Sequence, residues 1–395
     1  MPGPGPLDGY RIIDVTQMVS GPMATMILAD QGADVIKIEP TGVGDLTRGL
    51  GGTKRGMAPT FAVINRGKRS VAINLKDARG VDLLKDLVRS ADVFIQNFRP
   101  GAADRMGIGE PELRRIKPDL IYVSISGFGE KGPYVHKRVY DPVVQALSGL
   151  AAIQADAATG RPRMMRLIIP DKVTALTAAQ AITAALLART RTGKGQHVRL
   201  AMLDAVVAFM WPEGMARHTF KSTDGVAVRG GVRDLVFETA DGYITVGAVS
   251  DVEWDGLART IGHPEWLDDP RFKTPTSRAR YADERLELTQ QALAGKTSAE
   301  WLAKFDAAQV PCAPILSRED LFNDPQIAAN ELIVESVHPH AGAMRQPRPA
   351  ARYEGTPTQL PRPAPMLGEH TDAVLADLGI SPEKVSSLRT SAVVE

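Results

Sequence analysis

The sequence predicts an α/β fold with a doubly wound sheet, because strand-like and helix-like segments alternate through the first half of the chain. Residues 11–15 (RIIDV) have the short apolar pattern of a buried strand. Residues 21–31 follow as a helix with Pro22 in its first turn, where a missing N–H costs little. Residues 34–39 (DVIKIE) supply a second strand, so we expect a parallel pair with a right-handed crossover.

The same alternation continues along the chain. Residues 70–75 are expected to form a strand, and residues 78–90 a helix whose apolar residues share one face. Residues 92–97 and 120–125 have the composition of two further buried strands. A long alanine-rich helix, a short strand and another helix are then expected over residues 173–188, 196–200 and 201–210.

At 395 residues the chain exceeds the size at which a single core usually stops growing, so we expect two lobes. We assign residues 1–218 to a large lobe and residues 219–310 to a small one, with residues 311–395 returning to the large lobe. The Pro-rich stretch 330–365 is expected to be extended and to wrap or link. Shorter elements are expected in a strand at 242–249 and helices at 299–308 and 371–378.

The composition excludes several classes of protein. The formal net charge of +1, from 47 basic and 46 acidic residues, argues against nucleic acid or an anionic membrane as a main partner. The single cysteine, Cys312, rules out an internal disulfide framework and fits a cytoplasmic protein. Residues 1–8 lack the pattern of a signal peptide, and no apolar stretch is long enough to span a membrane. The seven histidines show no metal-ligand spacing, so we assign no metal.

Two loops in the first half of the chain are candidate ligand sites. Residues 17–22 (QMVSGP) follow the first strand, where open α/β sheets place ligands, but Gly21 alone does not make a nicotinamide fingerprint. That absence disfavours a dinucleotide-dependent dehydrogenase. Residues 65–70 (NRGKRS) carry three cations that could bind a phosphate, although a solvated basic turn explains them equally well. These cations are Arg66, Lys68 and Arg69, and Arg99 and Arg105 extend the basic rim.

Two aspartates at predicted helix starts are candidates for chemistry. Asp141, after Tyr140, is most simply a helix N-cap. Asp171 follows an apolar run and Pro170 and precedes the long helix, where the helix N-terminus favours its ionised form. Its residue type and position alone also fit an N-cap. Cys312 lies among prolines and apolar residues, as a buried structural thiol would.

Taken in order, these motifs resemble the CaiB/BaiF family, the class III CoA-transferases, over residues 7–380. No single motif decides the resemblance, but their joint order is specific. The motifs that carry it are Asp14, Gln17, GPMAT, LADQGADVIKIEP, NRGKRS, QNFRPG, ISGFGEKGP, RTGKGQ, VPCAPI and PMLGEHT.

The resemblance implies two lobes, a Rossmann-like large lobe containing both chain ends and a smaller α+β lobe, in an interlocked homodimer. It implies acyl-CoA and a small carboxylic acid as substrates, and no metal cofactor. Asp171 matches the aspartate that forms an acyl anhydride and then a CoA thioester, and Gln17 and Tyr140 would shape the acyl pocket. The positions matching the coenzyme A contacts are Gln17, Leu75, Asn97, Phe98 and Arg105.

Two departures from the family pattern bear on specificity, and three rival activities stay open. Formyl-CoA transferases carry a run of glycines where residues 225–233 keep only three, and a basic residue is often found where Pro40 stands. A 2-methylacyl-CoA racemase of the same family would have a histidine at the position of Tyr140, and His136 lies four residues earlier. A bile-acid or carnitine CoA-transferase and a non-catalytic CoA-binding protein would also fit these motifs.

Overall fold

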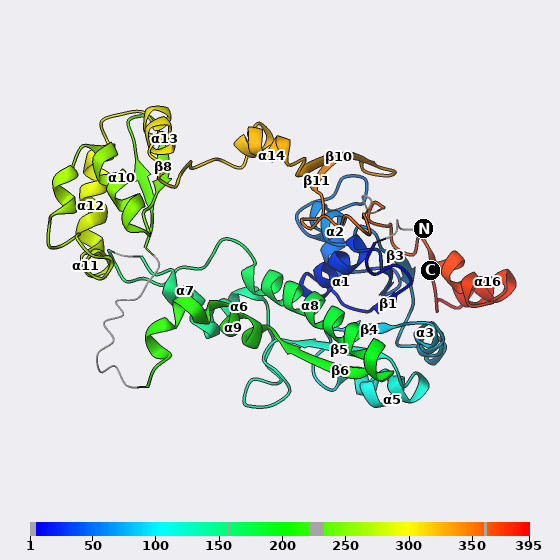
Figure 1. Ribbon diagram of the computed structural model, residues 1–395. Coiled ribbons are helices and arrows are strands. Elements are labelled where there is room, and N and C mark those ends of the chain that lie inside the picture. The colour runs from blue at the N-terminus through cyan, green and yellow to red at the C-terminus, as the bar shows by residue number, and fades with distance from the viewer. Residues whose placement is uncertain (1–4, 157, 222–232, 359–361) are drawn as a thin grey trace. The chain divides into compact units, whose positions relative to one another are not determined.

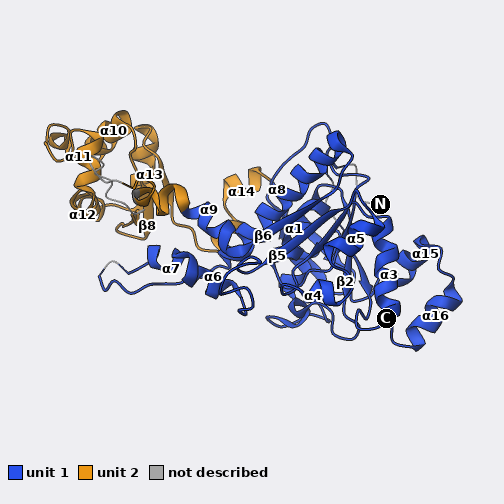
Figure 2. Cartoon of the chain, turned by 90° about the horizontal axis from the view of Figure 1, so that it is seen from below, with its two compact units in different colours: residues 1–210, 331–395 blue, residues 211–330 orange. Residues whose placement is uncertain are grey.

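The computed structural model describes residues 5–156, 158–221, 233–358 and 362–395. The chain divides into two compact units, residues 1–210 with 331–395 and residues 211–330 (Figure 2). The expected lobe boundaries lay at 218 and 311. Because residues 312–314 pair with a strand of the second unit, the chain returns to the first unit later than expected. The glycine-poor loop 225–233 falls almost entirely outside the described residues.

Unit 1 is built on a six-stranded parallel sheet with the order β3-β2-β1-β4-β5-β6 (Figure 1). This order confirms the predicted α/β class and is that of Rossmann-type sheets, in which ligands bind where the strand order reverses. Here the order reverses between β1 and β4. The strands are β1 (Arg11–Asp14), β2 (Asp34–Glu39), β3 (Arg69–Ala72), β4 (Val93–Gln96), β5 (Ile121–Ser126) and β6 (Gln196–Ala201).

Successive strand residues point to opposite faces of the sheet and build two separate cores. Ile12 packs on one face with helices α1 (Ser20–Asp30) and α8 (Ile169–Thr192), whose alanines permit a close approach. Ile13 packs on the other face. The helices of that face are α3 (Ala78–Arg89), α5 (Glu110–Ile116), α15 (Thr371–Asp377) and α16 (Pro382–Thr390), of which the sequence did not predict α5 and α16.

Helix α8 is long and apolar enough to cross a membrane by length and composition alone, with a mean hydropathy of 1.2 over its best window. Of that window, 44% is buried inside the protein. Its buried residues, among them Ala175, Ala178 and Ile182, belong to the core with α1. Helix α8 therefore packs as the core helix of a folded domain does.

The remaining elements of unit 1 correct one prediction. The Pro-rich stretch 330–365 is not simply extended, because it contains an antiparallel hairpin of β10 (Ile333–His338) and β11 (Gly342–Pro347). The alternating side chains of that hairpin satisfy the strand pattern, and its prolines lie in the turn between the strands (Pro339) or at the end of β11 (Pro347). The other helical segments are η1 (Leu46–Gly49), α2 (Pro59–Ile64), α4 (Ala102–Arg105), α6 (Asp141–Ser148), α7 (Leu150–Ile153) and α9 (Met202–Gly214), the last of which crosses the unit boundary.

Unit 2 has its own aromatic core over a small antiparallel sheet, β7 (Val236–Glu238), β8 (Tyr243–Val246) and β9 (Cys312–Pro314). Trp254, Trp266 and Trp301 are buried in that core. Capping boxes start three of its helices, α10, α11 and α13. Its helical segments are η2 (Ala216–His218), α10 (Asp251–Ile261), η3 (Pro264–Leu267), α11 (Pro275–Arg280), α12 (Ala282–Leu293), α13 (Ser298–Ala307), η4 (Asp320–Phe322) and α14 (Pro325–Ala329).

Candidate active site

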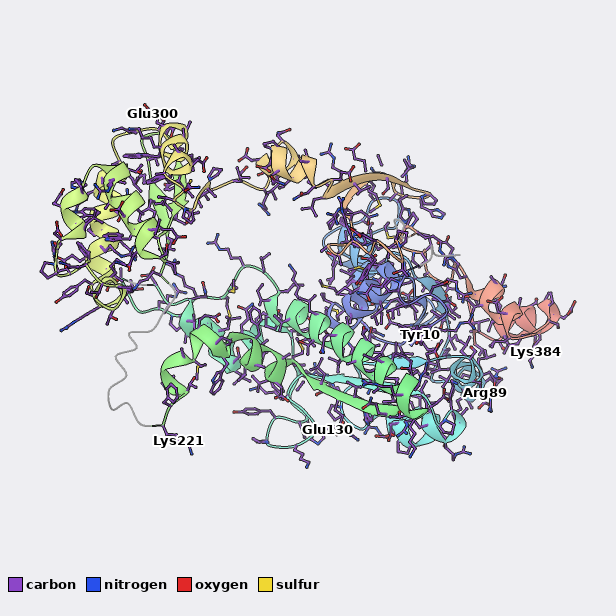
Figure 3. All side chains as sticks on the ribbon, in the orientation of Figure 1. Tyr10, Arg89, Glu130, Lys221, Glu300 and Lys384 are labelled. Carbon is purple, nitrogen blue, oxygen red and sulfur yellow. The ribbon has the colours of Figure 1, made fainter. Side chains whose placement is uncertain are left out.

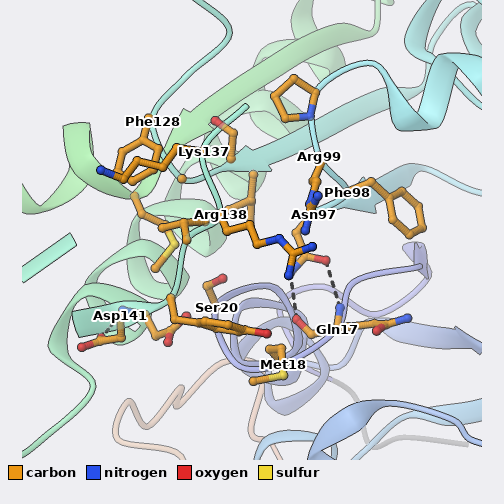
Figure 4. Close-up of a pocket in the computed structure, with 18 of the residues that line it drawn as sticks. Gln17, Met18, Ser20, Asn97, Phe98, Arg99, Phe128, Lys137, Arg138 and Asp141 are labelled. Atoms are coloured by element: carbon orange, nitrogen blue, oxygen red, sulfur yellow. Dashed lines mark hydrogen bonds between the residues drawn. The ribbon is translucent and has the colours of Figure 1, made fainter. Parts of the chain in front are cut away.

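A cavity of about 440 Å³ opens in unit 1 at the carboxyl ends of β1, β4 and β5 (Figure 4). This is the edge of the sheet at which the strand order reverses. Asp171, Asp141, Ser20, Gln17 and Tyr140 line it together. Its apolar wall comes from Met18, Leu46, Phe98, Ile125, Phe128, Val135, Val139 and Met202.

Asp171 lies inside the first turn of α8, not before it. The helix begins at Ile169, with Ile168 as its N-cap and Pro170 in its first turn, so the expected start at residue 173 was too late. The backbone N–H of Asp171 donates to Asp141 Oδ2 at 3.2 Å. The N-cap interpretation of Asp171 is therefore wrong, which leaves its carboxylate for the cavity.

The Asp171 carboxylate is less acidic than its place at a helix N-terminus suggested. Burial raises its pKa to about 6, with a further contribution from the neighbouring Asp141 carboxylate. Hydrogen bonds from the side chain and backbone of Ser20, the first residue of α1, act in the opposite direction. Two helix N-termini thus meet at this carboxylate, yet desolvation outweighs them.

Asp141 is the second carboxylate of the site. It is almost fully buried, and Oδ1 accepts a hydrogen bond of 2.6 Å from Gln145 Nε2, one turn along α6. Asp141 is the first helical residue, whereas Tyr140 occupies the N-cap without a side-chain bond, so the N-cap interpretation of Asp141 is also wrong. Its carboxylate instead ties the start of α6 to the start of α8.

The loop between β1 and α1 is locked by the amide of Asn97. Gln17 N donates to Asn97 Oδ1 at 3.0 Å, and Asn97 Nδ2 donates to Gln17 O at 2.8 Å (Figure 4). Met18 beside them has a φ of 68°, which is uncommon for a residue with a side chain. Each end of the Asn97 amide makes one of these bonds, so Asn97 fixes the backbone of the loop beside the cavity that it also lines.

A second cavity of about 740 Å³ lies at the carboxyl ends of β1, β2 and β3. It shares Gln17 and Phe98 with the first cavity, so the two meet at these side chains. Leu75 and Arg105, both expected near a coenzyme, line it together with Lys76. The structure therefore offers a smaller cavity containing a carboxylate beside a larger cavity with cations on its wall.

Comparison with known proteins identifies the family. The family model described as CoA-transferase family III matches residues 7–371. The chain belongs to this family. It is 36% identical to the succinyl-CoA:glutarate CoA-transferase of Mus musculus, over 99% of this chain and 90% of that protein. It is 34% identical to a formyl-CoA:oxalate CoA-transferase of Streptomyces avermitilis, over 98% of this chain and 99% of that one.

Solved structures agree with this assignment. The protein Rv3272 of Mycobacterium tuberculosis superposes with a TM-score of 0.82 at 32% identity, over 95% of this chain and 99% of that one. A CaiB/BaiF family protein from Brucella suis gives a TM-score of 0.79 at 29% identity, over 96% of this chain and 100% of that one. The predicted resemblance to this family and the predicted enzyme class, a CoA-transferase, are confirmed.

The basic turn at residues 65–70 does not serve as the sequence suggested. Lys68 is fully buried and pairs with Asp14 at 3.0 Å, and Arg66 is buried against Asp30 at 2.6 Å. Arg69 bonds Asp34 and Asp377. Since these cations are occupied by carboxylates and none lines a described cavity, we correct the expectation that they bind coenzyme phosphates.

Five other cations line the two cavities. Arg99, Lys137 and Arg138 line the first cavity, and Lys76 and Arg105 line the second. None of the five forms an ion pair among the residues that the structure describes. Lys76, Lys137 and Arg138 were not predicted from the sequence, although the adjacent bases at 137–138, just before Tyr140, were a usable signal.

The remaining candidates have clear positions. Tyr140 lines the first cavity and is 62% exposed, whereas His136 is not among the residues that line it. Cys312 lies in unit 2, where burial and the neighbouring Asp306 raise the pKa of its thiol to about 11, as expected for a structural cysteine. Within the described parts of the chain, no three histidine, cysteine or acidic side chains cluster as metal ligands would.

Replacing Asp171 by Asn should stabilise the protein at pH 8 by about 1 to 2 kcal/mol, because the charged form is the one that burial disfavours. The folded-state pKa of about 6 lies above the ordinary 3.8, so the wild type loses stability as the pH rises through this window. The difference should vanish near pH 4. Urea unfolding of both proteins at pH 4 and pH 8 measures it.

Asp77→Asn is the matched control, because hydrogen bonds from Arg79 lower the pKa of this exposed N-cap carboxyl to about 2. It should gain no stability at pH 8. Equal unfolding curves for wild type and Asp171→Asn at pH 8 would show that the Asp171 carboxylate is not desolvated.

Proposed function

We propose that this protein transfers CoA from an acyl-CoA donor to a carboxylic acid acceptor, with the Asp171 carboxylate as the nucleophile. The observation that carries the proposal is a partly buried carboxylate in a small cavity that adjoins a larger cavity suited to a nucleotide. Membership of CoA-transferase family III supports the reaction class. The sequence prediction of the same reaction therefore stands as our proposal.

The reaction needs no proton transfer. An Asp171 carboxylate oxygen attacks the thioester carbonyl, the C–S bond breaks, and CoA thiolate leaves an acyl–aspartyl anhydride. The thiolate then attacks the aspartyl carbonyl and releases the donor acid as a carboxylate. The acceptor carboxylate reverses these two steps with its own acyl group, which yields the new acyl-CoA and restores Asp171. Water must be excluded, since it would hydrolyse either intermediate.

We propose that the nucleotide part of CoA lies in the larger cavity, against Leu75, Phe98 and Arg105. Arg105 and Lys76 are the cations that can face its phosphates. Gln17 and Phe98 stand where both cavities meet, so the thiol end of CoA would pass them on its way to Asp171. Gln17 and Tyr140 would then border the acyl group.

The acyl group that best suits the smaller cavity is that of a small dicarboxylic acid. Arg99, Lys137 and Arg138 give this cavity three cations against the two carboxylates of Asp141 and Asp171. None of the three forms a described ion pair, so one of them can pair with a distal carboxylate of the substrate. The relatives named above act, by their names, on succinyl, glutarate, formyl and oxalate groups. A cationic cavity of about 440 Å³ disfavours the quaternary ammonium of carnitine and a bulky bile acid.

A racemase finds less support. Such an enzyme must remove and return a weakly acidic proton, which requires two placed acid–base groups. Tyr140 offers a phenol beside Asp171, and a phenol is a poor base at neutral pH. His136 is not among the residues that line the cavity. A non-catalytic CoA-binding protein would have no use for a desolvated carboxylate in the smaller cavity.

Incubation with succinyl-CoA should label Asp171 covalently, because the proposed intermediates are an anhydride and a thioester of its carboxylate. Hydroxylamine should convert the peptide carrying Asp171 to a hydroxamate only when acyl-CoA is present, as read by mass spectrometry. Asp171→Asn should lose at least about a thousandfold in kcat, on the scale of removing a covalent nucleophile, while it still binds CoA. Rapid exchange of the substrate α-proton for solvent deuterium, without any adduct, would instead favour the racemase.

Arg105→Ala should raise the KM for acyl-CoA about tenfold without changing the melting temperature, because this exposed cation makes no described ion pair. Arg66→Gln should lower the melting temperature and leave the KM unchanged, since Arg66 is buried against Asp30. Steady-state kinetics and thermal unfolding of both variants check this. A raised KM in Arg66→Gln alone would return the phosphate role to the basic turn.

We also propose a homodimer, interlocked as the family resemblance implies. Unit 1 leaves large apolar side chains in solvent on α8 and α9, with Leu176, Leu187 and Phe209 each 57% to 58% exposed. Leu176 and Leu187 are eleven residues apart, about three helical turns, so both lie on one face of α8, and we place the interface on this exposed apolar face. In the sequence, unit 2 is inserted between two parts of unit 1, so the chain leaves unit 1 and later returns to it.

Sedimentation velocity should find a dimer even at nanomolar concentration, because interlocked chains cannot separate without unfolding. Leu176→Asp combined with Leu187→Asp should disfavour assembly, whereas Val249→Asp, at a 90% exposed site in unit 2, serves as the comparison. A wild-type monomer at low concentration would contradict the interlocked arrangement and leave the catalytic proposal untouched.

A further inference from the structure

Three polar side chains on neighbouring strands form a chain of hydrogen bonds that ends at the loop between the two cavities. Gln96 ends β4, Ser124 lies on β5 and His197 lies on β6. Gln96 Nε2 lies 2.9 Å from Ser124 Oγ, which lies 2.9 Å from His197 Nε2. At the other end, the backbone N–H of Phe98 donates to Gln96 Oε1 at 2.7 Å.

The chemistry of its groups fixes the direction of the chain from Phe98 to Ser124. The Phe98 N–H can only donate, so the Gln96 amide must present Oε1 to it and Nε2 to Ser124. The Ser124 hydroxyl therefore accepts from Gln96 and keeps its own proton to donate. Among the described hydrogen bonds, His197 Nε2 is the acceptor available to that proton. When Nε2 accepts this proton, neutral His197 carries its own proton on the buried Nδ1.

The surroundings of His197 hold the ring in place and keep it neutral. Its edge meets the ring of Tyr122 at 5.0 Å and 82°. Burial lowers the pKa of His197 below its ordinary value, and the charge of Arg199 adds to this. A cavity of about 380 Å³ adjoins the ring, whereas Nδ1 itself is buried and has no described hydrogen-bond partner.

The other charged groups near His197 largely cancel. Arg114 lowers its pKa, while Glu110 and Glu130 raise it. Glu130, labelled in Figure 3 on the loop after β5, pairs with Arg199 at 3.0 Å, and Glu110 pairs with Arg114 at 2.8 Å. Because each glutamate is engaged by an arginine, neither stabilises a charged His197 strongly.

We propose that His197 and Ser124 are positioning residues, in which neutral His197 receives the Ser124 hydroxyl proton and so orients Gln96 to hold the backbone of Phe98. Phe98 stands between the two cavities, and the adjoining Asn97 locks the backbone of Gln17. Through these hydrogen bonds, β6 at the edge of the sheet would fix the position of the residues between the proposed coenzyme cavity and Asp171. The expected effect of these residues on CoA transfer rests on the proposed function, whereas the hydrogen-bond chain itself does not.

The tautomer is tested first, without any assay of activity. In protein carrying ¹⁵N-histidine, His197 should show a protonated Nδ1 and an unprotonated, hydrogen-bonded Nε2. Ser124→Ala should move the Nε2 resonance towards that of a free imidazole nitrogen. A proton on Nε2 in the wild type would overturn the proposal, because the chain would then run in the opposite direction.

The positioning role is tested by exchange and kinetics together. His197→Phe keeps a ring against Tyr122 but removes the acceptor, so the KM for acyl-CoA should rise about fivefold, the scale of one lost hydrogen bond, with kcat changed less than about twofold. Amide exchange of a peptide covering residues 96–99 should speed up. His197→Gln, which restores an acceptor, should recover both, and His263→Phe in unit 2 should alter neither.

Unchanged exchange and unchanged KM in His197→Phe and Ser124→Ala, with normal melting temperatures, would overturn the positioning role. If the wild type shows no CoA transfer, the proposed function fails instead, and the tautomer and exchange results still decide this inference.

Discussion

A fully buried carboxylate, that of Asp14 at the end of β1, holds the loop on which both cavities depend. Burial alone would raise the pKa of Asp14, but the ammonium groups of Lys68 and Lys37, with hydrogen bonds from two threonines, hold it well below the usual range. Lys37 also donates to Thr16 O at 2.8 Å and pairs with Asp45 at 2.9 Å. Buried ion pairs of this kind add little net folding free energy. Removing one partner is costly, however, because it leaves the other charges buried and unpaired, so the network fixes a single loop conformation.

That fixed loop explains why certain glycines surround the site. A Cβ on Gly21, next to Ser20, would stand 2.4 Å from the side chain of Thr16, which bonds Asp14. A Cβ on Gly127 would stand 2.5 Å from Val139, just before the Tyr140–Asp141 pair. Neither glycine has the positive φ that would itself require glycine. At both positions glycine is needed because a neighbouring side chain packs against its Cα. This close packing lets the two segments that carry Ser20 and Asp141 converge on Asp171.

The sequence predicted the strands of the sheet well, but it did not predict which cations line a cavity. Both outcomes have one physical reason. Apolar periodicity reports directly on burial, and the strands at 11–15 and 34–39 lie within one residue of β1 and β2. A cation in a motif has no such signature. Lys68 and Arg105 look alike in sequence, yet one is sealed against Asp14 and the other lines a cavity, because tertiary packing decides which cation meets a carboxylate. The same limit applied to Asp171, whose helix position was nearly right but whose acidity depends on burial and on Asp141, thirty residues earlier.

The raised pKa of Asp171 also bears on the proposed chemistry. In an anhydride, the carboxylate of the stronger acid is the better leaving group. A substrate carboxyl resembling that of glutamate has a pKa of about 4.3, whereas that of Asp171 is about 6. Attack by CoA thiolate at the aspartyl carbonyl expels the substrate acid, and attack at the substrate carbonyl expels Asp171. A more basic Asp171 therefore favours the first outcome, the aspartyl thioester, over return to the starting acyl-CoA. Desolvation, which a simple helix N-cap would avoid, would thus direct the proposed intermediate forward while the carboxylate stays mostly ionised at neutral pH.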